Sequence, residues 1–155
     1  VGDGNGPGAV LNLDRDTSVP VRGTVTTQGA IERVDLVVNG EVVETVDGDG
    51  RDRVTLTAEI PANESLWVAL RAFDVAEGAE IFGHTSPIYL LHDGQAVLVE
   101  ADARYLLGKV DQLIEYTEAL DGFRVEAHRT ETLALYEQAR AIYQRLAGGR
   151  PLVDR

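Results

Sequence analysis

Two neighbouring segments carry the side chains with the clearest potential for chemistry. His84 lies in the segment Gly83–Tyr89, and Trp67 and Arg71 lie four residues apart on the preceding apolar run, on one face of a strand. A histidine, an arginine and a tryptophan on adjacent strands could form a polar cluster that binds an anion. The alternative is structural: a hydrogen-bonded His84, Trp67 filling the core, and Arg71 paired with an acidic neighbour. We therefore take His84, Arg71 and Trp67 as the residues that could line a cleft or contact a ligand.

The other polar residues form no catalytic or metal-binding pattern. Ser86 belongs to no Gly-x-Ser-x-Gly motif and has no nearby base. His92 and His128 lack the spacing of a zinc site, and the chain has no cysteine to complete one. Both histidines are expected in solvent near the end of an element. The sequence therefore predicts no catalytic residue, no metal ligand and no cofactor in this chain.

The segment Asp47–Asp52 alternates aspartate with glycine, as calcium-binding loops do. An EF-hand loop needs an oxygen ligand at its fifth position, glycine at its sixth and glutamate at its twelfth. Those positions hold Arg51, Asp52 and Ala58. The segment is therefore predicted to be a plain hairpin turn.

Composition narrows the classes of partner. The 155 residues include 26 acidic and 14 basic residues, giving a formal net charge of −12. Such a surface repels phosphate backbones, which argues against nucleic-acid binding. No apolar run approaches the roughly 18 residues that a membrane-spanning helix needs. The chain also contains no methionine, even at residue 1, so we expect it to be a piece of a longer polypeptide.

Residues 9–99 have the two-residue hydrophobic period of β-strands. Asn39-Gly40 separates two such runs and favours a type I′ hairpin. Short strands with turn signals every 8–12 residues predict an immunoglobulin-like antiparallel β-sandwich. The expected strands are Ala9–Leu13, Ser18–Thr26, Ile31–Asn39, Glu41–Val46, Arg53–Ile60, Ser65–Phe73, Glu80–Leu91 and Gln95–Val99.

Residues 100–148 have a helical period instead. Helices are predicted over 100–120 and 126–147, forming a two-helix hairpin; Asp121-Gly122 ends the first helix and Gly148-Gly149 the second. The glycine-rich residues 1–8 are predicted to be a junction, and residues 149–155 a tail. The apolar stripes are expected at Leu106, Val110, Leu113, Thr117 and Leu120, with Leu107 and Ile114 beside them, and at Leu135, Ala139, Ile142 and Leu146.

Several of these segments resemble one family. Leu66–Ala72, His84–Leu90 and Ala101–Tyr105 are similar to the C-terminal region of CehA/McbA-type metallohydrolases, which are related to the polymerase-and-histidinol-phosphatase (PHP) hydrolases. The hairpin Ile31–Gly40 is similar too, as is the later set Tyr136, Ala139, Arg140 and Tyr143. The resemblance covers most of residues 9–147, and His84–Tyr89 is its most specific part.

The resemblance implies that the parent protein is a metal-dependent hydrolase. In that family an upstream PHP-like domain holds the divalent metal with His and Asp residues, so no catalytic residue transfers to this chain. The expected role is a non-catalytic accessory domain that packs against the missing catalytic domain of the same polypeptide. A bacterial envelope or secreted location would follow from exported family members.

Two other functions stay open. The chain could be a free-standing immunoglobulin-like module that binds a carbohydrate or a cell-surface ligand. Aromatic residues make up 6% of the chain and Trp67 is expected in the core, so an exposed aromatic row on one sheet face would favour this function. The chain could also form a homo-oligomer through its helices, which a large exposed apolar patch would favour.

Overall fold

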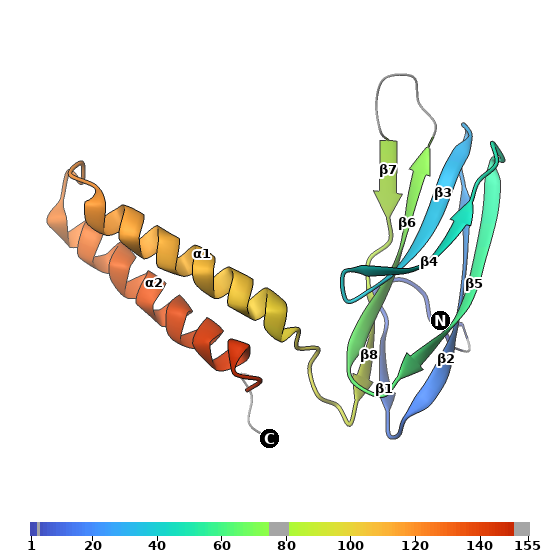
Figure 1. Ribbon diagram of the computed structural model, residues 1–155, viewed down its shortest axis with the longest axis horizontal. Helices are drawn as coiled ribbons and strands as arrows, with labels where there is room; N and C mark the ends of the chain where they lie inside the picture. The colour runs from blue at the N-terminus through green and yellow to red at the C-terminus, as the bar shows by residue number, and fades with distance from the viewer. Residues whose placement is uncertain (3, 75–80, 151–155) are drawn as a thin grey trace. The chain divides into compact units, whose positions relative to one another are not determined.

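The computed structural model describes residues 1–2, 4–74 and 81–150 (Figure 1). The chain divides into two compact units, Val1–Val97 and Leu98–Arg155, which are described separately. The strands of the first unit are β1 (Val10–Leu13), β2 (Thr17–Thr26), β3 (Ile31–Val38), β4 (Glu41–Asp47), β5 (Arg53–Ala62), β6 (Leu66–Asp74), β7 (Ile81–His84) and β8 (Ile88–His92).

The first unit is a β-sandwich (Figure 1). Its larger sheet has the order β1-β8-β6-β3-β4, with β7 also paired to β6, and its smaller sheet pairs β2 with β5. This division of the strands is that of immunoglobulin-like sandwiches, so the predicted fold class is confirmed. One pairing differs from the prediction, because β1 runs parallel to β8. The sandwich is therefore antiparallel except at this edge.

The core lies between the two sheets and follows the two-residue period. In β5, for example, Val54, Leu56 and Ile60 are buried while the residues between them are half-buried or exposed. Fully burying a side chain of this size contributes roughly 1.5–3 kcal/mol. The other buried residues of this core cluster are Val19, Val21, Ile31, Val34, Leu36, Ala62, Leu66, Val68, Ile88 and Leu90.

The last strand of the larger sheet is interrupted. Both β7 and β8 pair with β6, as Arg71↔His84 on one side of the interruption and Val68↔Ile88 on the other. Between these two pairs, the three residues 85–87 lie opposite the two residues 69–70 of β6. The extra residue makes this a one-residue bulge. Thr85 repairs the ladder there: its N–H donates to the Leu70 carbonyl at 2.9 Å, and its Oγ1 accepts from the Leu70 N–H at 3.1 Å.

The two predicted aspartate and asparagine turns form as expected. Asn39 and Gly40 have φ values of 48° and 94°, the positive angles that a type I′ hairpin requires. In the second turn Arg51 donates from Nη2 to the Asp47 carbonyl and from Nε to the Gly48 carbonyl, both at 2.8 Å. An arginine thus closes the loop in which aspartates alternate with glycines.

Two segments outside the strands differ from simple expectation. The glycine-rich start is irregular but contacts the sandwich, since Gly2 N donates to the Pro20 carbonyl and Gly8 N to the Pro87 carbonyl, both at 3.0 Å. The predicted strand Gln95–Val99 is wrong, because these residues form no strand. The side of β8 that does not face β6 is already occupied by β1, so the chain leaves the sheet there.

The second unit is a helical hairpin of α1 (Glu100–Ala119) and α2 (Glu126–Ala147), which confirms both predicted helices (Figure 1). Gly148 ends α2, where its N–H donates to the carbonyls of Gln144 and Arg145, each at 3.2 Å. Asp111 Oδ1 and Arg140 Nε form an ion pair between the helices at 2.9 Å. On α1 the buried residues are Ala103, Val110, Ile114 and Thr117.

The predicted apolar stripes are partly wrong. Four of their members are 39–62% exposed, namely Leu106, Leu113, Leu135 and Ile142. The buried face of α1 combines two small side chains, Ala103 and Thr117, with two larger ones of the predicted set. At 100° per residue, the four exposed side chains project from the flank of the hairpin opposite the Asp111–Arg140 ion pair.

Candidate functional site

The outward face of the larger sheet brings the three predicted residues together. Side chains of a strand alternate between faces, and the inward positions of β6 are taken by core residues. Trp67 and Arg71 consequently point outward from β6. The register places His84 directly opposite Arg71, and Tyr89 directly opposite Trp67.

The outward side chains form rows across the strands. One row is polar and crosses four strands as Thr45, Asp35, Arg71 and His84. Two residues further along β6 from the polar row, the next outward row contains Phe73 opposite Phe82. On the other side of the polar row, Val37 lies opposite Ala69, and the pair Trp67 and Tyr89 follows. Polar groups are thus flanked by apolar and aromatic rows on both sides.

A groove of about 590 Å³ runs over this face. Small residues, Ala69 and Gly40 among them, contribute to its lining, and aromatic rings stand at its ends. Among its described lining residues there is one arginine and one histidine, but no aspartate or glutamate. The lining residues are Val37, Gly40, Trp67, Ala69, Arg71, Phe82, His84, Thr85, Pro87 and Tyr89.

Arg71 is held in place by a buried carboxylate. The Asp35 side chain is 4% exposed, and its Oδ2 accepts from Arg71 Nη2 at 2.9 Å and Nε at 3.3 Å. Its Oδ1 accepts from the Thr45 hydroxyl at 2.9 Å and lies 3.7 Å from Arg33 Nε. The structure therefore contains the acidic neighbour of Arg71 that the structural alternative required, while Arg71 also lines the groove.

Aromatic contacts support the other side of the arginine. The Phe73 ring has the guanidinium carbon of Arg33 at 3.6 Å and that of Arg71 at 5.1 Å from its centroid. Its centroid lies 6.1 Å from that of Phe82, which is 61% exposed. Such cation–π contacts orient a guanidinium in addition to any ion pair.

His84 is exposed at the edge of the groove. Its Nδ1 lies 3.1 Å from the Thr85 carbonyl oxygen. A carbonyl only accepts, so Nδ1 is the donor and carries a hydrogen. Nε2 is thereby assigned as the acceptor of the neutral ring, available to a ligand hydroxyl.

The expectation that Trp67 fills the core is wrong. Trp67 is half-buried and lies outside the core cluster, on the outward face of β6. Its backbone N–H donates to Asn39 Oδ1 at 3.0 Å, which ties β6 to the β3–β4 turn. Together with Tyr89 and Phe82, it provides exposed aromatic surface on one sheet face.

Among the residues of this site that were not predicted as site residues, three provide its charged and aromatic side chains: Asp35, Tyr89 and Phe82. Asp35 could have been noticed as a charged residue inside the apolar run Val34–Val38, because a buried charge requires a partner. Tyr89 and Phe82 follow only once the register across β6 is known.

The other two histidines are not among the described residues that line the groove. His92 ends β8, where its Nε2 is 3.0 Å from Asp16 Oδ1 and its Nδ1 is 3.4 Å from Asp93 Oδ2. His128 is exposed on α2. Within residues 1–2, 4–74 and 81–150, no three His, Cys, Asp or Glu side chains are grouped to hold a metal ion.

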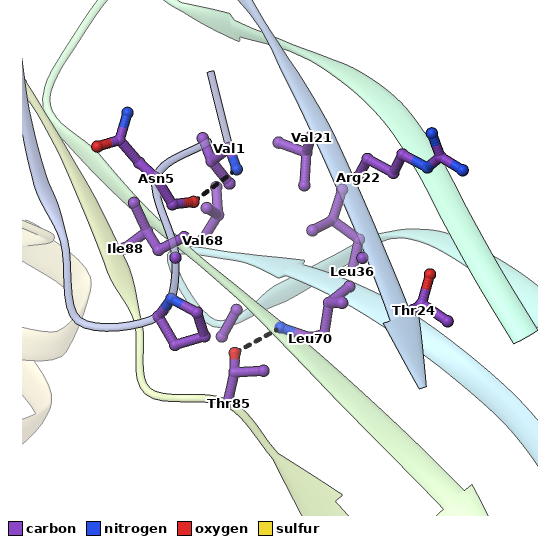
Figure 2. A pocket seen from close by; sticks show the side chains of 14 residues that line it. Val1, Asn5, Val21, Arg22, Thr24, Leu36, Val68, Leu70, Thr85 and Ile88 are labelled. Carbon is purple, nitrogen blue, oxygen red and sulfur yellow. Dashed lines mark hydrogen bonds between the residues drawn. The ribbon is translucent and has the colours of Figure 1, made fainter. Parts of the chain in front are cut away.

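A second cavity of about 230 Å³ lies under the N-terminal segment (Figure 2). Figure 2 shows the Val1 ammonium donating to the Asn5 carbonyl at 2.8 Å, beside inward side chains such as Val21 and Leu70. Gly23 leaves room for the Leu70 side chain, which would have to shift for a Cβ there because Leu70 Cδ1 would lie 2.0 Å from it. The described lining is mostly apolar and offers no acid–base pair.

Comparisons with known proteins give one structural likeness. No family model matches the chain, and no curated protein matches it. A solved structure of Clostridium thermocellum CbhA fibronectin(III)-like modules is 20% identical, with a TM-score of 0.37, covering 57% of this chain and 93% of that chain. The assignment of the sandwich rests on its own strand order and register.

The relationship to metallohydrolases, with a divalent metal in a separate catalytic domain, stays a prediction.

Neither described helix is long and apolar enough to cross a bilayer.

Proposed function

We propose that this chain is a non-catalytic binding module that holds a carbohydrate chain on the outward face of its larger sheet. The observation that carries the proposal is the groove, in which Trp67 and Tyr89 stand at one end and Phe82 at the other, with Arg71 and His84 nearby. Ligand sites are typically concave and apolar, with a few placed polar groups.

The chemistry of the lining matches that of a sugar. A pyranose ring has apolar C–H faces, which pack on the faces of aromatic rings, and hydroxyl groups at its rim. Trp67 and Tyr89 supply the aromatic faces, and both present an apolar body with a polar tip. Arg71 offers donors, and His84 Nε2 offers an acceptor for a hydroxyl.

The site is also built on rigid elements. Strand pairing fixes Trp67 and Tyr89, and the buried Asp35 fixes Arg71. Side chains that are ordered before binding lose less entropy when the ligand arrives, which favours affinity.

Binding fits the lining better than hydrolysis does. Most glycoside hydrolases use two carboxyl groups that flank the scissile bond. The described lining of the groove contains neither aspartate nor glutamate. An accessory position in a longer metal-dependent hydrolase is compatible with this role, since such a module would hold substrate or pack near the catalytic domain. An extracellular or envelope location belongs to the same proposal.

The test is a binding panel. Calorimetry or affinity electrophoresis with neutral and acidic polysaccharides should identify a ligand for the full chain, and Trp67→Ala should weaken its binding at least about tenfold, equivalent to about 1.4 kcal/mol. Tyr105→Ala is the matched control, because Tyr105 is 65% exposed on α1. Equal binding by the wild type and Trp67→Ala would refute the proposed site.

A further inference from the structure

We infer that the ligand of this groove is an acidic glycan, in which a sugar carboxylate accepts hydrogen bonds from Arg71. The inference rests on the proposed function and specifies the class of carbohydrate. Its starting point is a contrast in charge. The chain carries 26 acidic residues against 14 basic ones, yet the described lining of the groove has an arginine, a histidine and no carboxylate.

Arg71 is arranged to bind a second carboxylate. Its contacts with Asp35 use Nε and Nη2, so the two N–H groups of Nη1 are not used by that carboxylate. The Arg71 side chain is 39% exposed, whereas the Asp35 side chain is 4% exposed. The guanidinium therefore lies between a buried acid and the open groove. Because the buried acid fixes the planar fork, its remaining donors have a defined direction, which is what arginine offers and lysine does not.

The spacing of the site sets a minimum length for the ligand. Trp67 and Arg71 are four residues apart on β6, which corresponds to roughly 13 Å along a strand. One sugar ring does not span that distance. The ring stacked on Trp67 and the carboxylate bound by Arg71 therefore belong to different residues of one chain, so an acidic oligosaccharide should bind far better than an acidic monosaccharide.

Arg71 favours a carboxylate over a neutral group on its own side of the polar row. His84 lies directly opposite Arg71, and its Nε2 is the acceptor in the assigned tautomer, so the carboxylate binds on the Arg71 side and a sugar hydroxyl can donate to His84. A carboxylate gains a charge-assisted hydrogen bond from the arginine, and such bonds are roughly twice as strong as those between neutral groups. A hydroxyl also accepts from the charged guanidinium, but it lacks the attraction between two opposite charges that a carboxylate gains.

The experiment uses matched pairs of probes. Oligogalacturonate, alginate and hyaluronan oligomers are each compared with their carboxyl-reduced counterparts, which keep the backbone but lack the charge. At low salt we expect at least one acidic oligomer to bind about tenfold or more tightly than its reduced form, and the difference should shrink as salt is added. Arg71→Gln should bring the two forms to similar affinity, whereas Arg53→Gln, an exposed arginine on β5, should leave the difference intact.

A second variant separates the loss of binding from a loss of folding. Because Arg71→Gln removes a cation from the buried Asp35, the double variant D35N/R71Q provides a second test without that buried charge. Equal binding of acidic and reduced oligomers, both lost in Trp67→Ala, would overturn the acidic class and leave the proposed function standing. Binding of none of the glycans, or binding of an acidic peptide in their place, would overturn both.

Discussion

Replacement of Asp35 tests whether the polar row stabilises the sheet as well as the groove. Asp35 is 3% exposed and contacts Thr45, Arg71 and Arg33. Hydrogen bonds to charged groups contribute about 1.5–3 kcal/mol each. Breaking a fully buried ion pair costs about 3–5 kcal/mol, but the arginine side chains here are 31% and 39% exposed and can be rehydrated.

We therefore expect Asp35→Ala to lower the free energy of unfolding by about 3 kcal/mol. For a unit of this size that corresponds to a fall of roughly 12–24 °C in melting temperature. Asp35→Asn keeps an acceptor for the Thr45 hydroxyl and the shape of the side chain, so its cost should be about half as large. The control is Asp49→Asn, because Asp49 is 76% exposed and pairs with Arg51 only at the surface; its cost should stay below about 0.5 kcal/mol.

Urea unfolding followed by tryptophan fluorescence measures this change. Trp67 is the sole tryptophan of the chain and lies in the affected sheet, so the signal reports on the sandwich. Circular dichroism at the helical band follows the hairpin in parallel and shows whether the two units unfold together. If Asp35→Asn unfolds at the same urea concentration as Asp49→Asn, the polar row does not stabilise the sheet and the argument fails.

Two further predictions concern the other parts of the chain. Gly48→Ala should destabilise the sandwich by at least about 2 kcal/mol in the same urea assay, because a Cβ at this position would lie 1.8 Å from the Ile31 carbonyl oxygen. The comparison is Gly83→Ala on β7, where a Cβ meets nothing within 4 Å and φ is not positive; equal losses would contradict the steric reason. If the helices join two copies of the chain, the double variant Leu113→Lys with Leu135→Lys should convert a dimer to a monomer in sedimentation velocity, since both leucines lie on the exposed flank of the hairpin. Ala119→Lys with Ala141→Lys, at two exposed helix positions, is the control that adds the same charge, and a wild type that stays monomeric at high concentration would refute the homo-oligomer.

Most of the fold could be predicted because its signals are local. The alternation in β5 and the Asn39-Gly40 turn each involve neighbours in the chain, and both appear in the structure as expected. Local pattern does not show which strand lies beside which. The parallel pairing of β1 with β8 and the absence of a strand at Gln95–Val99 both depend on this choice.

For the helices too, the local pattern predicts the elements better than it predicts which of their side chains are buried. Their ends could be predicted from glycine and from the hydrophobic period, but the buried face of α1 only in part, because the predicted set included its buried members Val110, Ile114 and Thr117 together with exposed leucines. The period is satisfied equally by a stripe through Leu106 and Leu113 and by one through Val110 and Ile114, which lie on neighbouring faces of α1. Packing against α2 favours the second stripe, with Ala103 and Thr117 at the contact.

Trp67 illustrates why the candidate site was harder to predict than the fold. A tryptophan in an apolar strand is usually assigned to the core, although Arg71 on the same face of β6 already indicates that this face points outward. In the structure, Leu66 and Val68 are buried in the core. Because side chains alternate along a strand, Trp67 and Arg71 both point outward. Once Arg71 lies on that face, the charged Asp35 opposite it must also face outward, toward the arginine that neutralises it. The Asp35 carboxylate is accounted for by its contacts with Arg71, Arg33 and Thr45. The aromatic side chains of the same face stay partly exposed, and a ligand on that face would cover them.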